Sequence, residues 1–477
     1  MDPLCTASAT RLAQLIRTRE VSSREVVEAH IRRIERVNPV INAVVDTRYD
    51  DAREEAELAD ARAKAGGELP PFLGVPCTIK ECMGLSGMRK TSGLLSRRHI
   101  VAGRDGTAVK RLKGAGLIPL GVTNVSELMM WMETFNHIYG RTNNPYDPSR
   151  TVGGSSGGEG AVVGAGGSPM GLGADIGGSI RMPAFFNGVF GHKPTGGLVP
   201  ASGHYPMAEN DARRYNTVGP IVRHAEDLMP MLRILAGPDG EDGGCRDIPL
   251  GDPAAVRIDQ LTVYDVEDNG AFRVSPDLKA AQRDVAAHLA RRGARVEPFR
   301  HPIFKHSFDI WSAMMDAAAD TRFSQLLGDG EPVRGGRELV RWLFGARRHT
   351  LPSLGLVLLE KLPALLPGRA LRALELGRTL KADLLAKLGT TGVILYPSYP
   401  EPAPRHYRAL LPPLKWQYTA IWNVLEFCST QVPLGLNADG LPLGVQVAGV
   451  PGNDHVTIAV AHELERGFGG WVPPDRL

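Results

Sequence analysis

The chain has 477 residues, of which 43% are hydrophobic and 22% are charged, as is usual for a globular protein. The formal net charge is only +3 and no long run of Lys or Arg occurs, which argues against nucleic acid as a partner. The five cysteines are scattered and odd in number, and neither CxxC nor HExxH occurs, so we expect a reducing compartment and no metal or other cofactor.

The N-terminal region predicts helices and no targeting signal. Residues 1–20 carry charges every few positions and lack an apolar core of signal-peptide length. A second helix is expected to begin after Ser22, which has capping-box spacing from Glu25, and to end near Asn38. Nowhere do about 18 uncharged apolar residues run together, so we expect a cytoplasmic protein without a transmembrane segment.

Helices and strands alternate along the rest of the chain. An alanine- and acid-rich helix is expected at about 48–65, and FLGVPCTI at 72–79 is typical of a buried strand. Further strands are expected in QLTVYD, VILYPS and LPLGVQVAG, and further helices at about 276–292 and 453–467. Because no Pro/Ser-rich linker interrupts this alternation, we predict one α/β domain over residues 1–477.

Residues 337–377 differ from their surroundings because leucines crowd together there, with prolines between them and arginines beside them. We interpret the segment first as a buried helical hairpin. The alternative is an apolar flap over the substrate, or a face in peripheral contact with a membrane surface. We therefore expect a helical lid or insert at about 300–380. No coiled coil or interface signature occurs, which leaves a homo-oligomer open.

Glycine dominates residues 151–200, and two serine clusters lie there. The first, GGSSGGEG, holds Ser155 and formally matches the GxSxG elbow of α/β-hydrolases, a short pattern that arises easily in a glycine-rich stretch. The second, DIGGSIRMP, has Ser179 at its centre. Consecutive glycines let backbone N–H groups converge on one point, as an oxyanion hole requires. The predicted donors are the amides of Ile176, Gly177, Gly178 and Ser179, with Asp175 and Arg181 fixing the shape of the turn.

A serine nucleophile needs a base. None of the 13 histidines lies in a recognisable catalytic context. Lys80 ends a stretch of mostly apolar residues that we expect to be a buried strand. Burial would suppress its charge and make it a candidate base.

Three separated motifs, GVPCTIKE with Lys80, VGGSSGGEGA with Ser155 and DIGGSIRMPAFFNGVFGHKPT with Ser179, resemble the amidase signature family in order and spacing. The likeness extends over essentially the whole chain. Within the family the chain is most similar to the fatty-acid amide hydrolases, the second mammalian type in particular, through NHIYGRTNNPYDP, GHKPTGGLVPASGHYP, PLGLNADGLPLGVQV and FGGWV. The resemblance implies the amidase signature fold, a central mixed β-sheet flanked by helices, with its catalytic core at about 70–200. Membrane-bound mammalian relatives carry an N-terminal transmembrane segment that this sequence does not show, so anchoring does not carry over.

The resemblance also implies a Ser–Ser–Lys triad. Ser179 would be the nucleophile, Ser155 the proton relay and a neutral Lys80 the base, and the Gly154–Ser155 peptide would be cis. Ser156 would hydrogen-bond locally and help to orient Ser155 or Lys80.

The substrate pocket is less well specified by the sequence. Methionines adapt to irregular apolar shapes, although ordinary core packing explains any one of them equally well. No Arg or Lys in these motifs is placed to bind a carboxylate, so a small, neutral, hydrophobic amide is expected as the substrate. The predicted substrate-binding residues are Met129, Met130, Trp131, Met132, Gly154 and Phe185.

We therefore predict an amidase that acts on linear C–N amide bonds of hydrophobic acyl or aryl amides, and that also accepts esters or carbamates. The alternative is a glutamine-hydrolysing amidotransferase component that supplies ammonia to a partner protein. It would need a polar glutamine pocket, against which the methionine-rich 129–132 argues. A non-enzymatic binding protein is a third interpretation, which the presence of all three triad residues opposes.

Overall fold

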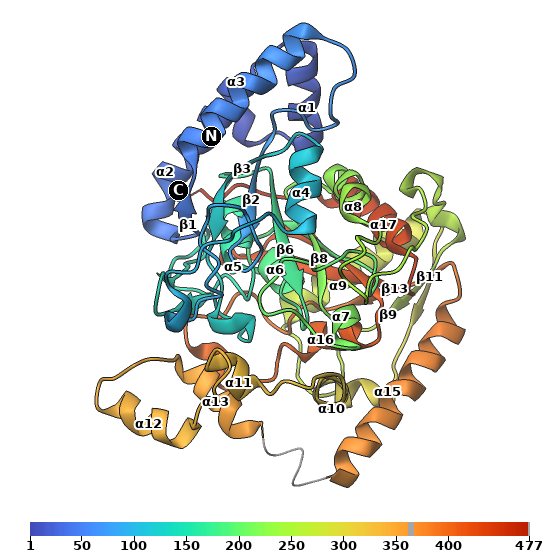
Figure 1. Ribbon diagram of the computed structural model, residues 1–477. Coiled ribbons are helices and arrows are strands. Elements are labelled where there is room, and N and C mark those ends of the chain that lie inside the picture. The colour runs from blue at the N-terminus through green and yellow to red at the C-terminus, as the bar shows by residue number, and fades with distance from the viewer. Residues whose placement is uncertain (361–366, 476–477) are drawn as a thin grey trace.

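The computed structural model describes residues 1–360 and 367–475 and is built around one large mixed β-sheet (Figure 1). The predicted α/β class with a mixed sheet is thus confirmed. Strands β2, β3 and β6 run parallel, as do β9, β10 and β11, whereas the pairs between these two groups are antiparallel. The 11 strands are, in sheet order, β1 (Val44–Thr47), β3 (Ile118–Thr123), β2 (Pro76–Lys80), β6 (Met170–Asp175), β8 (Thr217–Val222), β7 (Phe190–Lys193), β12 (Cys428–Leu436), β13 (Pro442–Gly449), β11 (Gly392–Tyr396), β9 (Thr262–Asp265) and β10 (Arg295–Pro298). A separate two-stranded sheet pairs β4 (Phe135–Asn136) with β5 (Gly140–Arg141).

The central strands are fully buried because helices cover both faces of the sheet (Figure 1). Their apolar, β-branched sequences fit this environment. Since β2 and β6 are parallel neighbours, their carboxyl ends lie at the same edge of the sheet. Lys80 ends β2 and Asp175 ends β6, so the topology brings the lysine motif and the second serine motif together.

Three helices at the N-terminus form the upper part of the molecule in Figure 1: α1 (Ala9–Thr18), α2 (Ser23–Ile41) and α3 (Tyr49–Ala65). The capping box between Ser22 and Glu25 is present, and α3 matches the predicted helix. The predicted strand at 72–79 was wrong in its first half. Residues 71–74 form a turn, in which Gly74 has φ +80°, and β2 begins only at Pro76.

Most of the remaining helices pack around the sheet, and those predicted at 276–292 and 453–467 are confirmed as α9 and α17. Helix α10 lies against α15 and α16. The bounds of these helices are α4 (Thr107–Gly114), α5 (Gly157–Gly164), α6 (Arg181–Phe186), α7 (Ala212–Tyr215), α8 (Leu228–Leu235), α9 (Pro276–Arg291), α10 (Ser307–Ala318), α11 (Phe323–Leu327), α12 (Gly335–Leu343), α13 (Leu351–Leu359), α15 (Pro367–Leu388), α16 (Gln417–Val424) and α17 (Asp454–Phe468).

The leucine-rich segment 337–377 is helical but it is not the buried hairpin that its sequence suggested. Helix α12 packs against α13, and its other side is left uncovered. Leu343 is 70% exposed and Phe344 is 87% exposed. Both helices lie at the lower edge of the molecule in Figure 1. Residues 361–366 of the segment lie outside the described residues.

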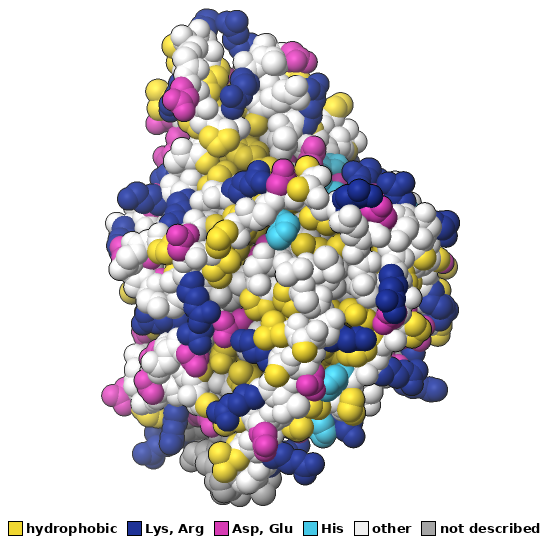
Figure 2. Space-filling view, turned by 90° about the vertical axis from the view of Figure 1, so that its right-hand side faces the viewer, with side chains coloured by type: hydrophobic (Ala, Val, Ile, Leu, Met, Phe, Trp, Pro, Cys, Tyr) yellow, Lys and Arg dark blue, Asp and Glu magenta, His cyan; other side chains and the backbone are white. Residues whose placement is uncertain are grey.

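Charges of both signs are interspersed over the face drawn in Figure 2, with no broad patch of one sign, in keeping with the small net charge. Within residues 1–360 and 367–475, no helix combines the length and the apolar character that a membrane crossing needs.

Candidate active site

Lys80 occupies the centre of the candidate site. Its side chain is almost fully buried at the end of β2. The Nζ atom donates to Ser155 Oγ at 2.8 Å and to the carbonyl oxygen of Ala174 at 3.1 Å. Burial disfavours the ammonium form and lowers the pKa of Lys80 below its ordinary value, while nearby acidic groups oppose the shift. The environment therefore favours the neutral amine that a base requires.

Ser155 lies just before α5, and the Gly154–Ser155 peptide bond is cis, as the resemblance implied. Gly154 has no room for a side chain, because a Cβ there would lie 2.5 Å from the carbonyl oxygen of Trp131. Ser156 donates to the carbonyl oxygen of Ala174 at 3.2 Å, the same oxygen that accepts from Lys80. The expected local hydrogen bond of Ser156 is therefore present. It holds the carbonyl oxygen of Ala174, which also accepts from Lys80.

Ser179 lies in the turn between β6 and α6, and only 7% of its surface is exposed. The amide of Ser156 donates to its carbonyl oxygen at 3.3 Å, which joins the two serine motifs through their backbones. Among the described contacts, no side-chain hydrogen bond joins Ser179 to Ser155. The structure thus gathers all three predicted triad residues in one buried region, with the Lys80–Ser155 contact already made.

The turn that carries Ser179 is held by a buried ion pair. Arg181 donates to both carboxylate oxygens of Asp175 at 3.0 Å, as the sequence predicted. Burial alone would raise the pKa of Asp175, but the Arg181 guanidinium holds it well below its usual range. Asn423 also donates to this carboxylate, at 2.9 Å. The ionised carboxylate of Asp175 can therefore organise the amides around it.

One of the four predicted oxyanion donors is already occupied. The amide of Gly178 donates to Asp175 at 2.6 Å, so in this structure the carboxylate engages it. The amides of Ile176, Gly177 and Ser179 donate to no acceptor among the described hydrogen bonds. These three amides are unengaged, as donors to an oxyanion would have to be.

Two side chains that the sequence did not reveal orient this turn. Thr419 Oγ1 donates to the carbonyl oxygen of Gly177 at 2.9 Å, and Trp311 Nε1 donates to that of Ile176 at 2.8 Å. Holding each carbonyl fixes the orientation of the adjoining peptide planes. Trp311 and Trp416 pack edge to face, with ring centroids 4.7 Å apart. Both come from segments far along the chain without a recognisable motif, so no local signal could have identified them.

Five of the six predicted substrate-binding residues divide into two groups, and the sixth, Gly154, is buried beside Ser155. Met129, Met132 and Phe185 are buried in the protein core, as the core-packing interpretation expected. Met130 and Trp131 are partly exposed and pack at the margin of the core that contains Trp311. These two retain apolar surface that a ligand could contact.

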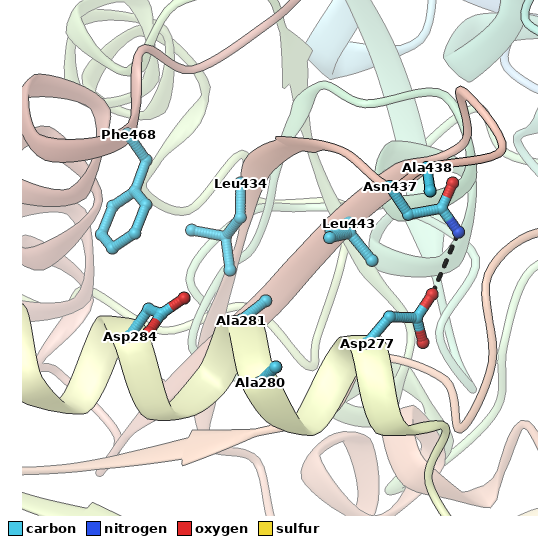
Figure 3. A pocket seen from close by; sticks show the side chains of 9 residues that line it. All are labelled: Asp277, Ala280, Ala281, Asp284, Leu434, Asn437, Ala438, Leu443 and Phe468. Atoms are coloured by element: carbon cyan, nitrogen blue, oxygen red, sulfur yellow. Dashed lines mark hydrogen bonds between the residues drawn. The ribbon is translucent and has the colours of Figure 1, made fainter.

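A pocket of about 290 Å³ lies elsewhere, between α9, the β12–β13 hairpin and the end of α17 (Figure 3). At one end of it, Asn437 donates to Asp277 at 3.0 Å, and Asp284 also borders the pocket. None of the predicted site residues lines this pocket. Within the described part of the chain, no three His, Cys, Asp or Glu side chains are grouped so that they could hold a metal ion.

Comparisons with known proteins identify the family of the chain. A family model described as Amidase matches residues 25–458. Human Fatty-acid amide hydrolase 2 is 45% identical over 494 residues, which cover 100% of this chain and 92% of the human protein. A glutamyl-tRNA(Gln) amidotransferase component from Synechococcus sp. (strain CC9605) is 30% identical over 97% of this chain and 96% of its own length. The solved structure of 6-aminohexanoate cyclic dimer hydrolase aligns with a TM-score of 0.80 and 27% identity, over 99% of both chains. This chain therefore belongs to the amidase signature family and is an enzyme that hydrolyses amide bonds.

Proposed function

We propose that the enzyme cleaves hydrophobic acyl or aryl amides through a Ser–Ser–Lys triad and an acyl-enzyme. The observation that carries this proposal is the 2.8 Å contact between Lys80 Nζ and Ser155 Oγ, two side chains that are almost fully buried. Because burial disfavours the ammonium form of Lys80, its amine can offer a lone pair to the hydroxyl proton of Ser155.

Acylation begins when Ser179 Oγ attacks the amide carbonyl carbon. Its proton passes to Ser155 Oγ, while the proton of Ser155 passes to Lys80 Nζ. The free amides of the turn stabilise the oxygen that becomes negative. The proton then returns from Lys80 through Ser155 to the substrate nitrogen, so that the C–N bond breaks with a neutral amine as leaving group.

Deacylation repeats the same path with water. Lys80 again accepts a proton through Ser155 as the water oxygen attacks the acyl carbon, and the proton returns to Ser179 when its ester bond breaks. Every proton moves within the triad, so no outside acid or base is needed. Esters and carbamates present a carbonyl to the same nucleophile and are expected to react too.

The surroundings favour a neutral, apolar acyl group. Met130, Trp131 and Trp416 contribute partly exposed apolar surface at the margin of one core cluster. The name of the 45% identical human relative, Fatty-acid amide hydrolase 2, supports fatty acyl amides as the first class to test.

The test is hydrolysis of acyl amides of graded chain length, aryl amides, esters and carbamates by the wild type and by Ser179→Ala. We expect hydrolysis that improves with acyl length and is lost in the variant. Wild-type levels of hydrolysis by Ser179→Ala would refute the proposed nucleophile.

A glutamine-hydrolysing amidotransferase component is the second candidate, since the Synechococcus relative is 30% identical over 97% of this chain. Release of ammonia from glutamine at a rate above that with acyl amides would favour it. The apolar surface of Met130 and Trp131 argues against a polar glutamine pocket.

We also propose that the uncovered side of α12 contacts a membrane surface. The neighbouring Leu343 and Phe344 are exposed, and the exposed Arg347 and Arg348 follow closely in the sequence. Apolar and basic side chains together match an anionic lipid surface.

A further inference from the structure

Glu159 is a buried carboxyl group that the mechanism above does not use. It lies in the first turn of α5, four residues after Ser155, and is fully buried. Its Oε2 accepts from Thr78 Oγ1 of β2 at 2.6 Å, and its Oε1 accepts from Thr123 Oγ1 of β3 at 2.8 Å. Both carboxyl oxygens therefore have neutral partners, and among the described hydrogen bonds neither accepts from a cation.

The sheet places this carboxyl beside the base. Thr78 and Lys80 are two residues apart on β2, so their side chains point to the same face of the strand. Gly171 pairs with Thr78 in the neighbouring strand β6, and a Cβ there would lie 2.0 Å from Glu159 Oε2. The glycine thus leaves space for a carboxyl group on the face that carries the catalytic lysine.

The charges around Glu159 identify the group on which it acts. From β2, Cys77 and Lys80 interact with it, and Lys80 is the cation among them. Cys82, two residues past Lys80, and Asp175 of β6 also act on Lys80. Burial raises the pKa of the Cys82 thiol to about 12, so it carries little charge, and the charge of Asp175 is compensated by Arg181 of α6. Arg33, the buried arginine of α2, donates to the carbonyl oxygen of Ala165 just past the opposite end of α5. Strand β8 contributes no titratable side chain.

We infer that Glu159 is a positioning residue for the base: its carboxylate is the counter-charge that stabilises the ammonium of Lys80 when the lysine accepts the proton of Ser155. The inference rests on the proposed triad. Proton transfer to Lys80 would otherwise create an unbalanced cation in a buried site, which is costly. Burial raises the pKa of Glu159 to about 8, against the hydrogen bonds of Thr78 and Thr123, so the carboxylate is present at alkaline pH.

The test follows the pH dependence of Ser179 labelling by a fluorophosphonate, located by peptide mass spectrometry. In Glu159→Gln the ammonium form of Lys80 loses its counter-charge. The rise of the labelling rate with pH, which is the acid limb of the profile, should therefore move to lower pH by about one unit. The plateau should fall because the base becomes weaker. Glu159→Asp keeps the charge and should return the limb toward the wild-type position.

Glu81→Gln is the matched control. Glu81 is also fully buried and adjoins Lys80 in sequence, but its carboxylate accepts from Thr91, Ser92 and Tyr139 instead. Its loss should leave the position of the limb unchanged. If Glu159→Gln does not fold, Thr123→Val takes its place, since it removes one donor to the carboxylate and should move the limb in the same direction.

An acid limb that stays in place in Glu159→Gln, or moves to higher pH, would overturn the inference while Ser179 labelling of the wild type upholds the triad. An equal shift in Glu81→Gln would overturn it as well. Absence of wild-type labelling at Ser179 would refute the proposed function itself, and the inference with it.

Discussion

Lys80 Nζ lies 2.8 Å from Ser155 Oγ, although 75 residues separate them in the sequence. The contact joins the end of β2 to the segment that leads into α5, and both side chains are almost fully buried. A charged lysine would be costly at this position. This is the relationship that the proposed base and proton relay require.

Replacing Lys80 by Ala should lower kcat/KM by about 10²–10⁴-fold near pH 8, because the hydroxyl proton then has no acceptor. The loss should be smaller at higher pH, where hydroxide can partly substitute. Lys90→Met is the control, since Lys90 is a partly buried lysine that donates to the carbonyl oxygen of Gly203 instead. Retention of wild-type kcat/KM in Lys80→Ala would contradict the role assigned to this residue.

Activity should rise with pH. Burial lowers the pKa of Lys80 below its ordinary 10.5, so the lysine loses its proton and becomes a base at a pH below 10.5. Below its folded-state pKa the lysine is protonated and kcat/KM falls; above that pKa, kcat/KM reaches a plateau. The unfolded chain binds this proton more tightly, so the contribution of Lys80 to folding stability also increases with pH across the window between the two values. A flat kcat/KM from neutral to alkaline pH, with an amide whose cleavage is limited by chemistry, is the contrary result.

Gly178→Ala should reduce kcat by about 10²-fold or more, because it distorts the turn that presents the free amides. A Cβ at this position would lie 1.9 Å from Thr419 Oγ1, and the residue has φ +119°. Gly103→Ala is the matched control, since a Cβ there meets nothing within 4 Å. Steady-state kinetics of both variants and their melting temperatures separate a local effect from unfolding, and normal kcat in Gly178→Ala would speak against the proposed oxyanion site.

Phe344→Glu should weaken binding to vesicles of phosphatidylcholine and phosphatidylserine by about tenfold or more, because burying a Phe side chain contributes about 2 kcal/mol. Phe344 is 87% exposed, and the control Leu58→Glu changes an apolar residue of α3 that is 70% exposed. Co-sedimentation measures the bound fraction. If the two variants bind the vesicles equally well, α12 is not the surface that contacts the membrane.

Much of the site could be predicted because its residues are clustered in three short motifs. The position of Lys80 at the end of a buried strand follows from the apolar run before it, and the Asp175–Arg181 pair follows from its spacing around the serine turn. Thr419 and Trp311 could not be predicted, since only the folded chain brings them to the carbonyls of that turn. Likewise, a sequence pattern cannot tell which amide of the turn Asp175 engages.

The fold was predicted well where burial determines the pattern, as in β11, β13 and α17. It was predicted poorly in α12, where apolar residues are helical but uncovered. Hydrophobic periodicity reports that a face is apolar; it does not report whether another element covers it.

The most direct test of the account is to react the purified protein with a fluorophosphonate and to locate the adduct by peptide mass spectrometry, in the wild type and in Ser179→Ala. We predict a single adduct on Ser179 that is absent from the variant. An adduct on Ser155 would contradict the account, because it would make the residue next to Lys80 the nucleophile instead of the relay.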